Sequence, residues 1–287
     1  MSGERGADGV VIRPLEGRSE RQACVALQER VWGKAFADRV PASVLMIALE
    51  TGGVASGAFD GGRLVGFIFG ITGVRDGRPF HWSDMLAVAP ERRGEGIGYR
   101  LKLHQRELLL ERGVEAVRWT FDPLEARNGQ LNLRRLGATA REYRRDVYGA
   151  SDSPLHAGIG TDRLVAEWTI ASPRVATRLG GGGGGAEPSG GEADAGGAPL
   201  LNPPVVAGGT SRPSATIAEP EAPTVRIAVP SDIQRLKQTD LTTAVAWRRN
   251  VRAAFERSFE AGYTAVDLER SRWTGVAGYV LVRGFSR

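Results

Sequence analysis

Cysteine is nearly absent from this sequence, which has a single one, Cys24, among 287 residues. One cysteine cannot form an intramolecular disulfide, and no other Cys or His lies near it at the spacing of a metal site. Cys24 falls in an apolar helical pattern, which favours buried packing over a nucleophilic role. The sequence therefore predicts neither a disulfide-stabilised scaffold nor a metal centre.

Long hydrophobic runs are also missing. No uninterrupted apolar stretch approaches the roughly 20 residues that a membrane-spanning helix needs. Residues 1–8 lack the apolar segment of a signal peptide. We therefore expect a cytoplasmic protein with no membrane partner.

The charge is moderately positive, with a formal net charge of +5. A positive charge favours anionic partners in general. The arginines are scattered, however, and no run interleaved with aromatic residues, zinc-finger spacing or helix-turn-helix pattern accompanies them. Nucleic-acid binding is therefore only a minor alternative, which would show as an affinity that falls steeply with salt.

A low-complexity segment divides the chain. Residues 179–224 contain six consecutive glycines, Gly180–Gly185, and many Pro, Ser and Ala residues. Such a composition cannot bury enough apolar surface to offset its ordering entropy. We expect a first domain over residues 1–172, a flexible linker over 173–224 and a C-terminal segment over 225–287. This last segment is small, so we expect it to dock on the first domain or on a second copy in a homodimer.

Hydrophobic periodicity predicts alternating strands and helices. A capping box at Ser19–Gln22 opens the first helix, and Asp60-Gly61-Gly62 forms a hairpin turn. In the first domain the predicted strands cover residues 10–12, 54–59, 63–71, 80–88, 114–121, 138–148 and 162–170, and the helices cover 19–32, 41–51, 98–112 and 128–136. The C-terminal segment has strands at 225–229, 263–268 and 277–282 and a helix from about 242 to 261.

The most informative motif is the glycine-rich turn Arg93-Gly94-Glu95-Gly96-Ile97-Gly98, which lies between an apolar strand and a helix. Without β-carbons at the glycines, the backbone can approach a phosphate closely, and the start of the helix supplies partial positive charge. A Walker loop would need Gly-Lys followed by Ser or Thr, and a Rossmann fingerprint would need a small residue in place of Tyr99. The turn therefore predicts an anion cradle of another kind.

In this context the turn resembles the coenzyme A motif of the GNAT acyltransferase superfamily, whose motif positions are met by Arg93, Gly96 and Gly98. The resemblance covers residues 10–170 and implies an α/β fold with a mixed, mostly antiparallel central sheet flanked by helices. It also implies acetyl-CoA as acyl donor, with the strand before the turn binding the pantetheine arm and the turn binding the pyrophosphate. The cofactor-binding residues implied are Leu86, Ala87, Val88, Arg93, Gly94, Glu95, Gly96, Ile97, Gly98, Tyr99 and Asn128.

More narrowly, the sequence looks like an uncharacterised group of predicted acetyltransferases. That likeness rests on Trp119-Thr120-Phe121-Asp122-Pro123-Leu124, Leu136-Gly137-Ala138 and Thr161-Asp162-Arg163, and it extends to Ala246-Trp247-Arg248 and Gly262-Tyr263. The C-terminal segment repeats the order strand, helix, hairpin of residues 117–170, so it resembles half of a second GNAT unit, a βαββ segment without a glycine cradle.

Two carboxylates are candidates for catalysis. Asp84 lies in the strand before the cradle, where the resemblance implies an acidic general base, and Asp122 follows the next strand. Structural alternatives stay open for both, as does helix capping for Asn128. The family's usual general acid is a tyrosine, and its position is occupied here by Leu133.

Tyr143 or Tyr148 could replace that tyrosine, or solvent could protonate the thiolate. The sequence therefore predicts an acetyl-CoA-dependent N-acyltransferase that acts on an unidentified small-molecule or peptide amine. The alternative is an acyl-CoA-binding or regulatory module with weak catalysis.

Overall fold

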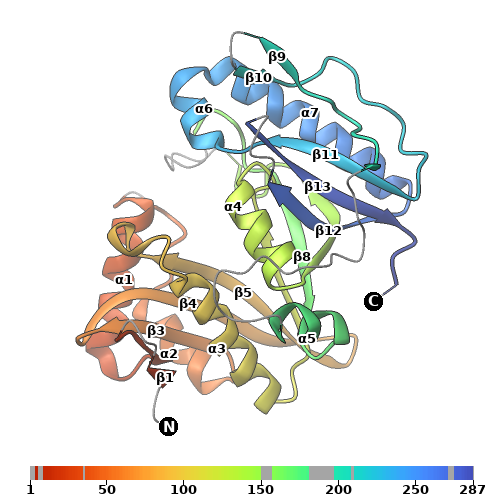
Figure 1. Ribbon diagram of the computed structural model, residues 1–287. Coiled ribbons are helices and arrows are strands. Elements are labelled where there is room, and N and C mark those ends of the chain that lie inside the picture. Colours follow the sequence, from red (N-terminus) through yellow and green to blue (C-terminus); the bar gives the residue numbers. More distant parts are fainter. Residues whose placement is uncertain are drawn as a thin grey trace. The chain divides into compact units, whose positions relative to one another are not determined.

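The computed structural model of the protein describes residues 4–5, 9–34, 36–149, 157–180, 197–207, 210–270 and 275–286. Its contacts divide the chain into two compact units, and the boundary falls between Trp119 and Thr120. None of the helices in the described ranges is long and apolar enough to cross a membrane. Figure 1 shows the elements of both units along the chain.

The first unit is a mixed sheet with helices. Its strands are ordered β1-β2-β3-β4-β5-β6, and all neighbours are antiparallel except β5 and β6, which are parallel. This confirms the predicted α/β class with a mostly antiparallel sheet. The elements are β1 Glu4–Arg5, β2 Val11–Pro14, α1 Gly17–Trp32, α2 Ala42–Glu50, β3 Val54–Asp60, β4 Arg63–Arg75, β5 Arg78–Val88, the short 3-10 helix η1 Pro90–Arg92, α3 Ile97–Glu111 and β6 Ala116–Phe121.

Opposite faces of this sheet pack against different helices. Phe67 and Phe69 join Cys24 and Leu45 in a hydrophobic cluster with α1 and α2. Gly66 points the other way, and a Cβ there would lie 3.2 Å from Ile97 Cγ2 on α3. Alternation along β4 therefore sends α3 to the face opposite α1 and α2. Cys24 is buried as predicted, and burial raises the pKa of its thiol to about 12.

One local prediction in this unit is wrong. The capping box at Ser19 is not used, because α1 begins at Gly17 with Glu16 as its N-cap residue. The carboxylate of Glu20 instead accepts a hydrogen bond from the Glu16 backbone N–H at 2.7 Å. The helix therefore starts about two residues earlier than the Ser/Thr preference at N-caps suggests.

The second unit contains an antiparallel sheet ordered β8-β7-β12-β13-β11. A separate hairpin is formed by β9 and β10. The elements after β6 are α4 Ala126–Gly129, the π-helical turn η2 Gln130–Arg135, β7 Thr139–Arg144, β8 Arg163–Thr169, α5 Pro173–Gly180, β9 Val205–Ala207, β10 Thr210–Arg212, β11 Thr224–Pro230, α6 Ile233–Thr239, α7 Leu241–Glu260, β12 Tyr263–Arg270 and β13 Val276–Arg283.

The C-terminal segment shares this sheet with β7, since Ala265 of β12 pairs with Ala140. Helix α7 buries Trp247 and Phe255 completely, and the Phe255 ring stacks on Tyr143 with centroids 6.0 Å apart. The boundary within β6 differs from the one expected near residue 172. The glycine-rich segment marks a change of composition, whereas the packing of β7 and β8 continues into the C-terminal strands.

Much of the range expected to be a flexible linker contains ordered structure. Leu201 and Asn202 are buried. The Asn202 side chain donates to the Ala228 carbonyl at 3.0 Å and accepts from the Ala228 N–H at 2.7 Å. Pro199 and Leu201 bond to the backbone of Arg226, so this stretch lies along β11. The predictions for residues 181–196 and 208–209 fall outside the described residues.

Candidate functional site

The candidate site is built on strand β5, which departs from regular pairing at Asp84. On the β4 side, Ser83 pairs with Gly70 and Met85 with Phe69, so Asp84 is the extra residue of a β-bulge. On the β6 side, the parallel pairs end at Trp82 and Arg118. Bulges re-aim side chains and disturb a ladder locally. In the described structure, the rest of β5 thus runs to Val88 without pairing to β6, and that edge is open to an amide-containing ligand.

Side chains on the free part of β5 divide between two faces. Leu86 and Val88 are half-buried and face α3, because a Cβ at Gly98 would lie 3.8 Å from each of them. Ala87 points into the hydrophobic cluster with α1 and α2. Leu86 and Val88 therefore offer apolar contact beside the open edge, whereas Ala87 can contribute only its backbone.

The glycine turn holds two residues in left-handed backbone conformations. Gly94 and Gly96 have φ angles of +93° and +79°, which residues other than glycine rarely adopt, and a Cβ at either position would meet open space. Gly96 is the N-cap of α3, and no side chain caps that end. The backbone N–H groups at the start of α3 therefore face a space that an anion can occupy.

The two arginines of the turn have different environments. Arg92 forms ion pairs with Asp60 and Glu95, the latter at 2.7 Å. Arg93 is exposed, and in the described ranges its side chain bonds the Val88 carbonyl, at 3.4 Å, and no carboxylate. Arg93 is therefore the cation available to a ligand, and Glu95 is neutralised by Arg92.

The Asp84 carboxyl has a raised pKa. Its side chain reaches solvent, yet its crowded surroundings and the nearby charge of Asp38 raise the pKa of its carboxyl above the usual range. A hydrogen bond from Trp82 opposes this shift in part. A carboxylate with a raised pKa accepts a proton more readily.

Asp122 and Asn128 lie in the second unit. Both carboxylate oxygens of Asp122 are engaged by Arg248, at 2.8 and 2.6 Å, and one also accepts from the Leu124 N–H at 2.8 Å. Asp122 and Arg248 are 4% and 3% exposed. This is the environment of a structural ion pair. Asn128 is exposed within α4, whose N-cap is Glu125, so the capping alternative for Asn128 is wrong.

The tyrosine candidates also lie in the second unit. Leu133, at the position of the expected tyrosine, is fully buried in η2. The Tyr143 hydroxyl donates to Asp162 at 2.7 Å, and burial together with that carboxylate raises the pKa of Tyr143 far above its usual value. Tyr148 is 48% exposed, with its hydroxyl 3.3 Å from Thr120 Oγ1. Tyr143 therefore has a structural role.

A buried polar cluster beside β5 was not predicted. Lys102, on the inner face of α3, donates to Ser83 Oγ at 2.8 Å, and its ammonium lies 3.8 Å from the centroid of the Trp119 ring. Gln105 connects Lys102 to His81, with distances of 3.3 and 3.0 Å. The available signal was helical spacing, because Lys102 falls between Leu101 and Gln105 on the stripe that α3 buries.

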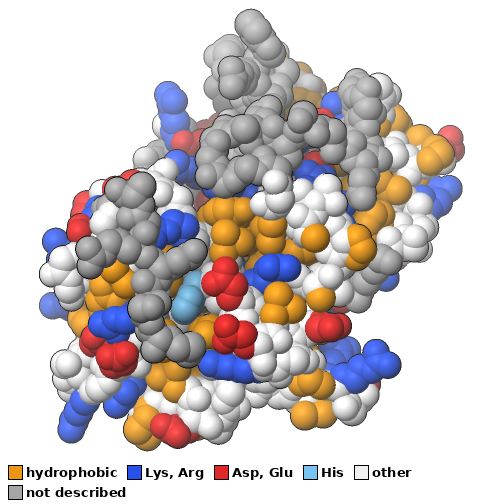
Figure 2. Space-filling model, turned by 60° about the horizontal axis from the view of Figure 1, so that its bottom comes forward, with side chains coloured by type: hydrophobic (Ala, Val, Ile, Leu, Met, Phe, Trp, Pro, Cys, Tyr) orange, Lys and Arg blue, Asp and Glu red, His pale blue; other side chains and the backbone are white. Residues whose placement is uncertain are grey.

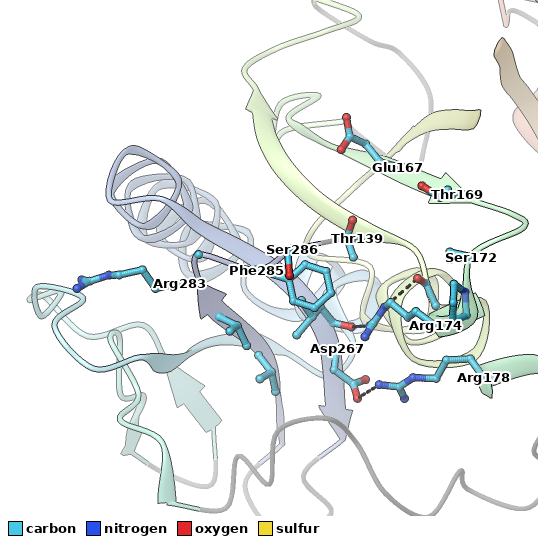
Figure 3. A pocket seen from close by; sticks show the side chains of 16 residues that line it. Thr139, Glu167, Thr169, Ser172, Arg174, Arg178, Asp267, Arg283, Phe285 and Ser286 are labelled. Carbon is cyan, nitrogen blue, oxygen red and sulfur yellow. Dashed lines mark hydrogen bonds and ion pairs between the residues drawn. The ribbon is translucent and has the colours of Figure 1, made fainter. Parts of the chain in front are cut away.

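A cavity of about 490 Å³ lies within the second unit (Figure 3). Its lining includes Thr139, Glu167, Arg174, Arg178, Asp267 and Phe285. Figure 3 shows Arg178 paired with Asp267, at 3.2 Å, so charged groups in the wall satisfy one another. None of the residues predicted for the site lines this cavity. On the face shown in Figure 2, basic and acidic side chains are interspersed in the described parts.

Comparison with protein families decides what kind of domain surrounds the cradle. Residues 22–136 match the acetyltransferase (GNAT) family. This part of the chain is similar to a GNAT acetyltransferase domain. The matched range includes the open edge of β5, the glycine turn and all of α3. No curated protein sequence matches the chain significantly.

Solved structures resemble the GNAT domain at low sequence identity. The ribosomal-protein-S18-alanine N-acetyltransferase from Escherichia coli is 20% identical, with a TM-score of 0.44, over 57% of this chain and 95% of its own. The putative acetyltransferase yncA from Salmonella typhimurium, solved with acetyl-CoA, is 15% identical, with a TM-score of 0.46, over 57% of this chain and 95% of its own. An aminoglycoside 6'-N-acetyltransferase complexed with coenzyme A is 18% identical, with a TM-score of 0.43, over 56% of this chain and 98% of its own.

Proposed function

We propose that this protein is an acetyl-CoA-dependent N-acetyltransferase that transfers an acetyl group to the amine of a small molecule or peptide. The observation that carries the proposal is the cradle. Gly94 and Gly96 hold left-handed conformations in front of an uncapped helix, beside a strand edge that has lost its partner. Backbone amides there suit a pyrophosphate, and the open strand edge suits the amides of a pantetheine arm.

The residues predicted for the cofactor then take distinct roles. Backbone N–H groups from Gly94 to Tyr99 bind the pyrophosphate, and Arg93 adds a positive charge. Leu86 and Val88 contact the pantetheine arm, with backbone groups of Leu86–Val88 as its hydrogen-bond partners. Asn128 is exposed within α4 and has no side-chain partner in the described structure, so its amide is available to a ligand.

Asp84 is the proposed general base. It accepts a proton from the acceptor ammonium, directly or through water, and the freed amine attacks the thioester carbonyl. Asp122 is assigned a structural role, because its carboxylate is fully occupied by Arg248 and Leu124. Holding the two substrates together supplies much of the remaining rate enhancement.

The runner-up is an acyl-CoA-binding module with weak turnover, favoured by the buried leucine at position 133. Consumption of the acetyl-CoA thioester across a panel of amines separates the two. We expect calorimetric binding of acetyl-CoA together with amine-dependent release of free CoA thiol. Binding without thiol release from any amine would favour the module, and absence of binding would contradict both.

Asp84→Asn is expected to lower kcat by about 100-fold, because an amide cannot accept the proton. Acetyl-CoA affinity should stay within about twofold of the wild type, since Asp84 lies off the cradle. The measurement is steady-state kinetics beside calorimetry. A kcat within about threefold of the wild type would show that Asp84 is not the base.

Asp38→Asn provides the matched control. The Asp38 charge raises the pKa of Asp84, so its removal lowers that pKa. The base is active when deprotonated, and the rate falls as pH drops through its pKa. The acidic limb of the pH profile should therefore move to lower pH in Asp38→Asn. A shift to higher pH would contradict the assignment.

A further inference from the structure

Lys102 occupies the point where β5 and β6 separate. The last pair between these strands joins Trp82 to Arg118, and Ser83 and Trp119 are the next residues. Lys102 Nζ contacts both of them, through a 2.8 Å hydrogen bond to Ser83 Oγ and a 3.8 Å approach to the Trp119 ring. The ammonium therefore lies at the closed end of the open strand edge.

This lysine is buried without a counterion. Lys102 is 2% exposed, and its ammonium forms no ion pair in the described ranges. Burial alone lowers the pKa of Lys102 to about 7. A methionine or leucine would fill the same space without desolvating an amine, so packing alone does not account for a lysine here.

The distance from the cradle to Lys102, measured along β5, matches the length of a pantetheine arm. Ser83 and Val88 lie at the two ends of the open edge of β5. An extended strand of that length spans about 17 Å, which is of the same order as an extended pantetheine arm. A pyrophosphate at Gly94–Gly98 therefore directs the sulfur end of the arm toward Lys102.

Other titratable groups near this point do not suit proton donation. His81 is bonded to Thr72 at 2.9 Å and to Gln105, and burial with the nearby Lys102 charge lowers its pKa to about 3. His81 is therefore neutral and has no acidic proton to give at neutral pH. Arg118, on β6, retains its proton at all working pH values. Asp84 is the proposed base.

We propose that Lys102 is the proton donor to the sulfur of the coenzyme, an inference that rests on the proposed acetyltransferase function. The acceptor nitrogen forms a bond to the thioester carbon and loses its second proton to solvent, the carbon–sulfur bond breaks and its electron pair passes to sulfur. Lys102 gives a proton from Nζ to that sulfur and becomes a neutral amine, which regains a proton from solvent. Asp84 releases to solvent the proton taken from the acceptor.

The test measures the thiol of bound CoA by the ultraviolet absorbance of its thiolate as a function of pH. A thiolate and a protonated Lys102 side by side stabilise each other, so Lys102 keeps its proton when the thiolate forms, and CoA bound to the wild type should titrate about one pH unit or more below free CoA. In Lys102→Met this shift should vanish. Lys102→Arg, which keeps the charge and does not release a proton, should retain the shift but lose about 100-fold in kcat.

Desulfo-CoA, which lacks the sulfur, is the control ligand. Its calorimetric affinity should be equal, within about twofold, in the wild type and Lys102→Met. If the CoA thiol titrates equally in the wild type and Lys102→Met while both still bind desulfo-CoA, the role of Lys102 is overturned and the proposed function is not. A loss of desulfo-CoA affinity in Lys102→Met would show a structural role instead. Failure of the wild type to bind desulfo-CoA would overturn the proposed function and this inference with it.

Discussion

Gly96→Val is expected to reduce the affinity for acetyl-CoA at least about 100-fold. Gly96 has a φ angle of +79° and open space where a Cβ would lie. In the proposed complex that space holds the pyrophosphate, so a branched side chain displaces the anion and turns the first amides of α3 away from it. Calorimetry with acetyl-CoA is the direct measurement.

Gly113→Val is the matched control for this substitution. Gly113 follows the opposite end of α3, with a φ angle of +69°, and a Cβ there would likewise have no atom within 4 Å. Both substitutions impose similar backbone strain, and only one touches the cradle. We expect similar losses of thermal stability but unchanged acetyl-CoA affinity in Gly113→Val. Equal affinities in the two variants would contradict the assignment of the cradle.

Arg248→Ala is expected to lower the free energy of unfolding of the second unit by about 3–5 kcal/mol. The substitution leaves the buried Asp122 carboxylate without its bidentate partner, at a site where both residues are less than 5% exposed. It also removes the bond from Arg248 Nε to the Ile159 carbonyl at 2.9 Å. Chemical denaturation of the full chain measures the loss.

Arg145→Ala provides a comparison in which burial is the main difference. Arg145 bonds both oxygens of Glu256 at 2.6 Å, but its side chain is 61% exposed. Exposed pairs contribute about 1 kcal/mol or less. The double variant Asp122→Leu, Arg248→Met should recover much of the stability lost in Arg248→Ala. Similar losses in Arg145→Ala and Arg248→Ala would contradict a structural role for the buried pair.

Most of the fold could be predicted because its local signals agree. Strand alternation and glycine stops placed β3, β5 and β13 with errors of at most two residues at their ends, whereas β4 runs four residues beyond its predicted end. The cradle was predictable for the same reason, since glycine spacing, a preceding apolar strand and a following helix are all local in sequence.

Features that depend on distant partners could not be predicted in the same way. Asp122 was a plausible base until its partner, 126 positions away, was visible. The bulge that singles out Asp84 arises from pairing with β4 and leaves no mark in the sequence of β5. Lys102 escaped notice because lysine is usually exposed on a helix, and only packing against Ser83 and Trp119 shows that this one is buried.

The stretch from Pro199 to Asn202 has a consequence for anyone who shortens this protein. By bonding to Arg226 and Ala228, it occupies the outer side of β11, which is the last strand of its sheet. Without it, the β11 backbone would present unsatisfied donors and acceptors that template pairing between molecules. A chain trimmed only within residues 181–196 keeps this natural guard against self-association, whereas one trimmed through Asn202 should elute as larger species.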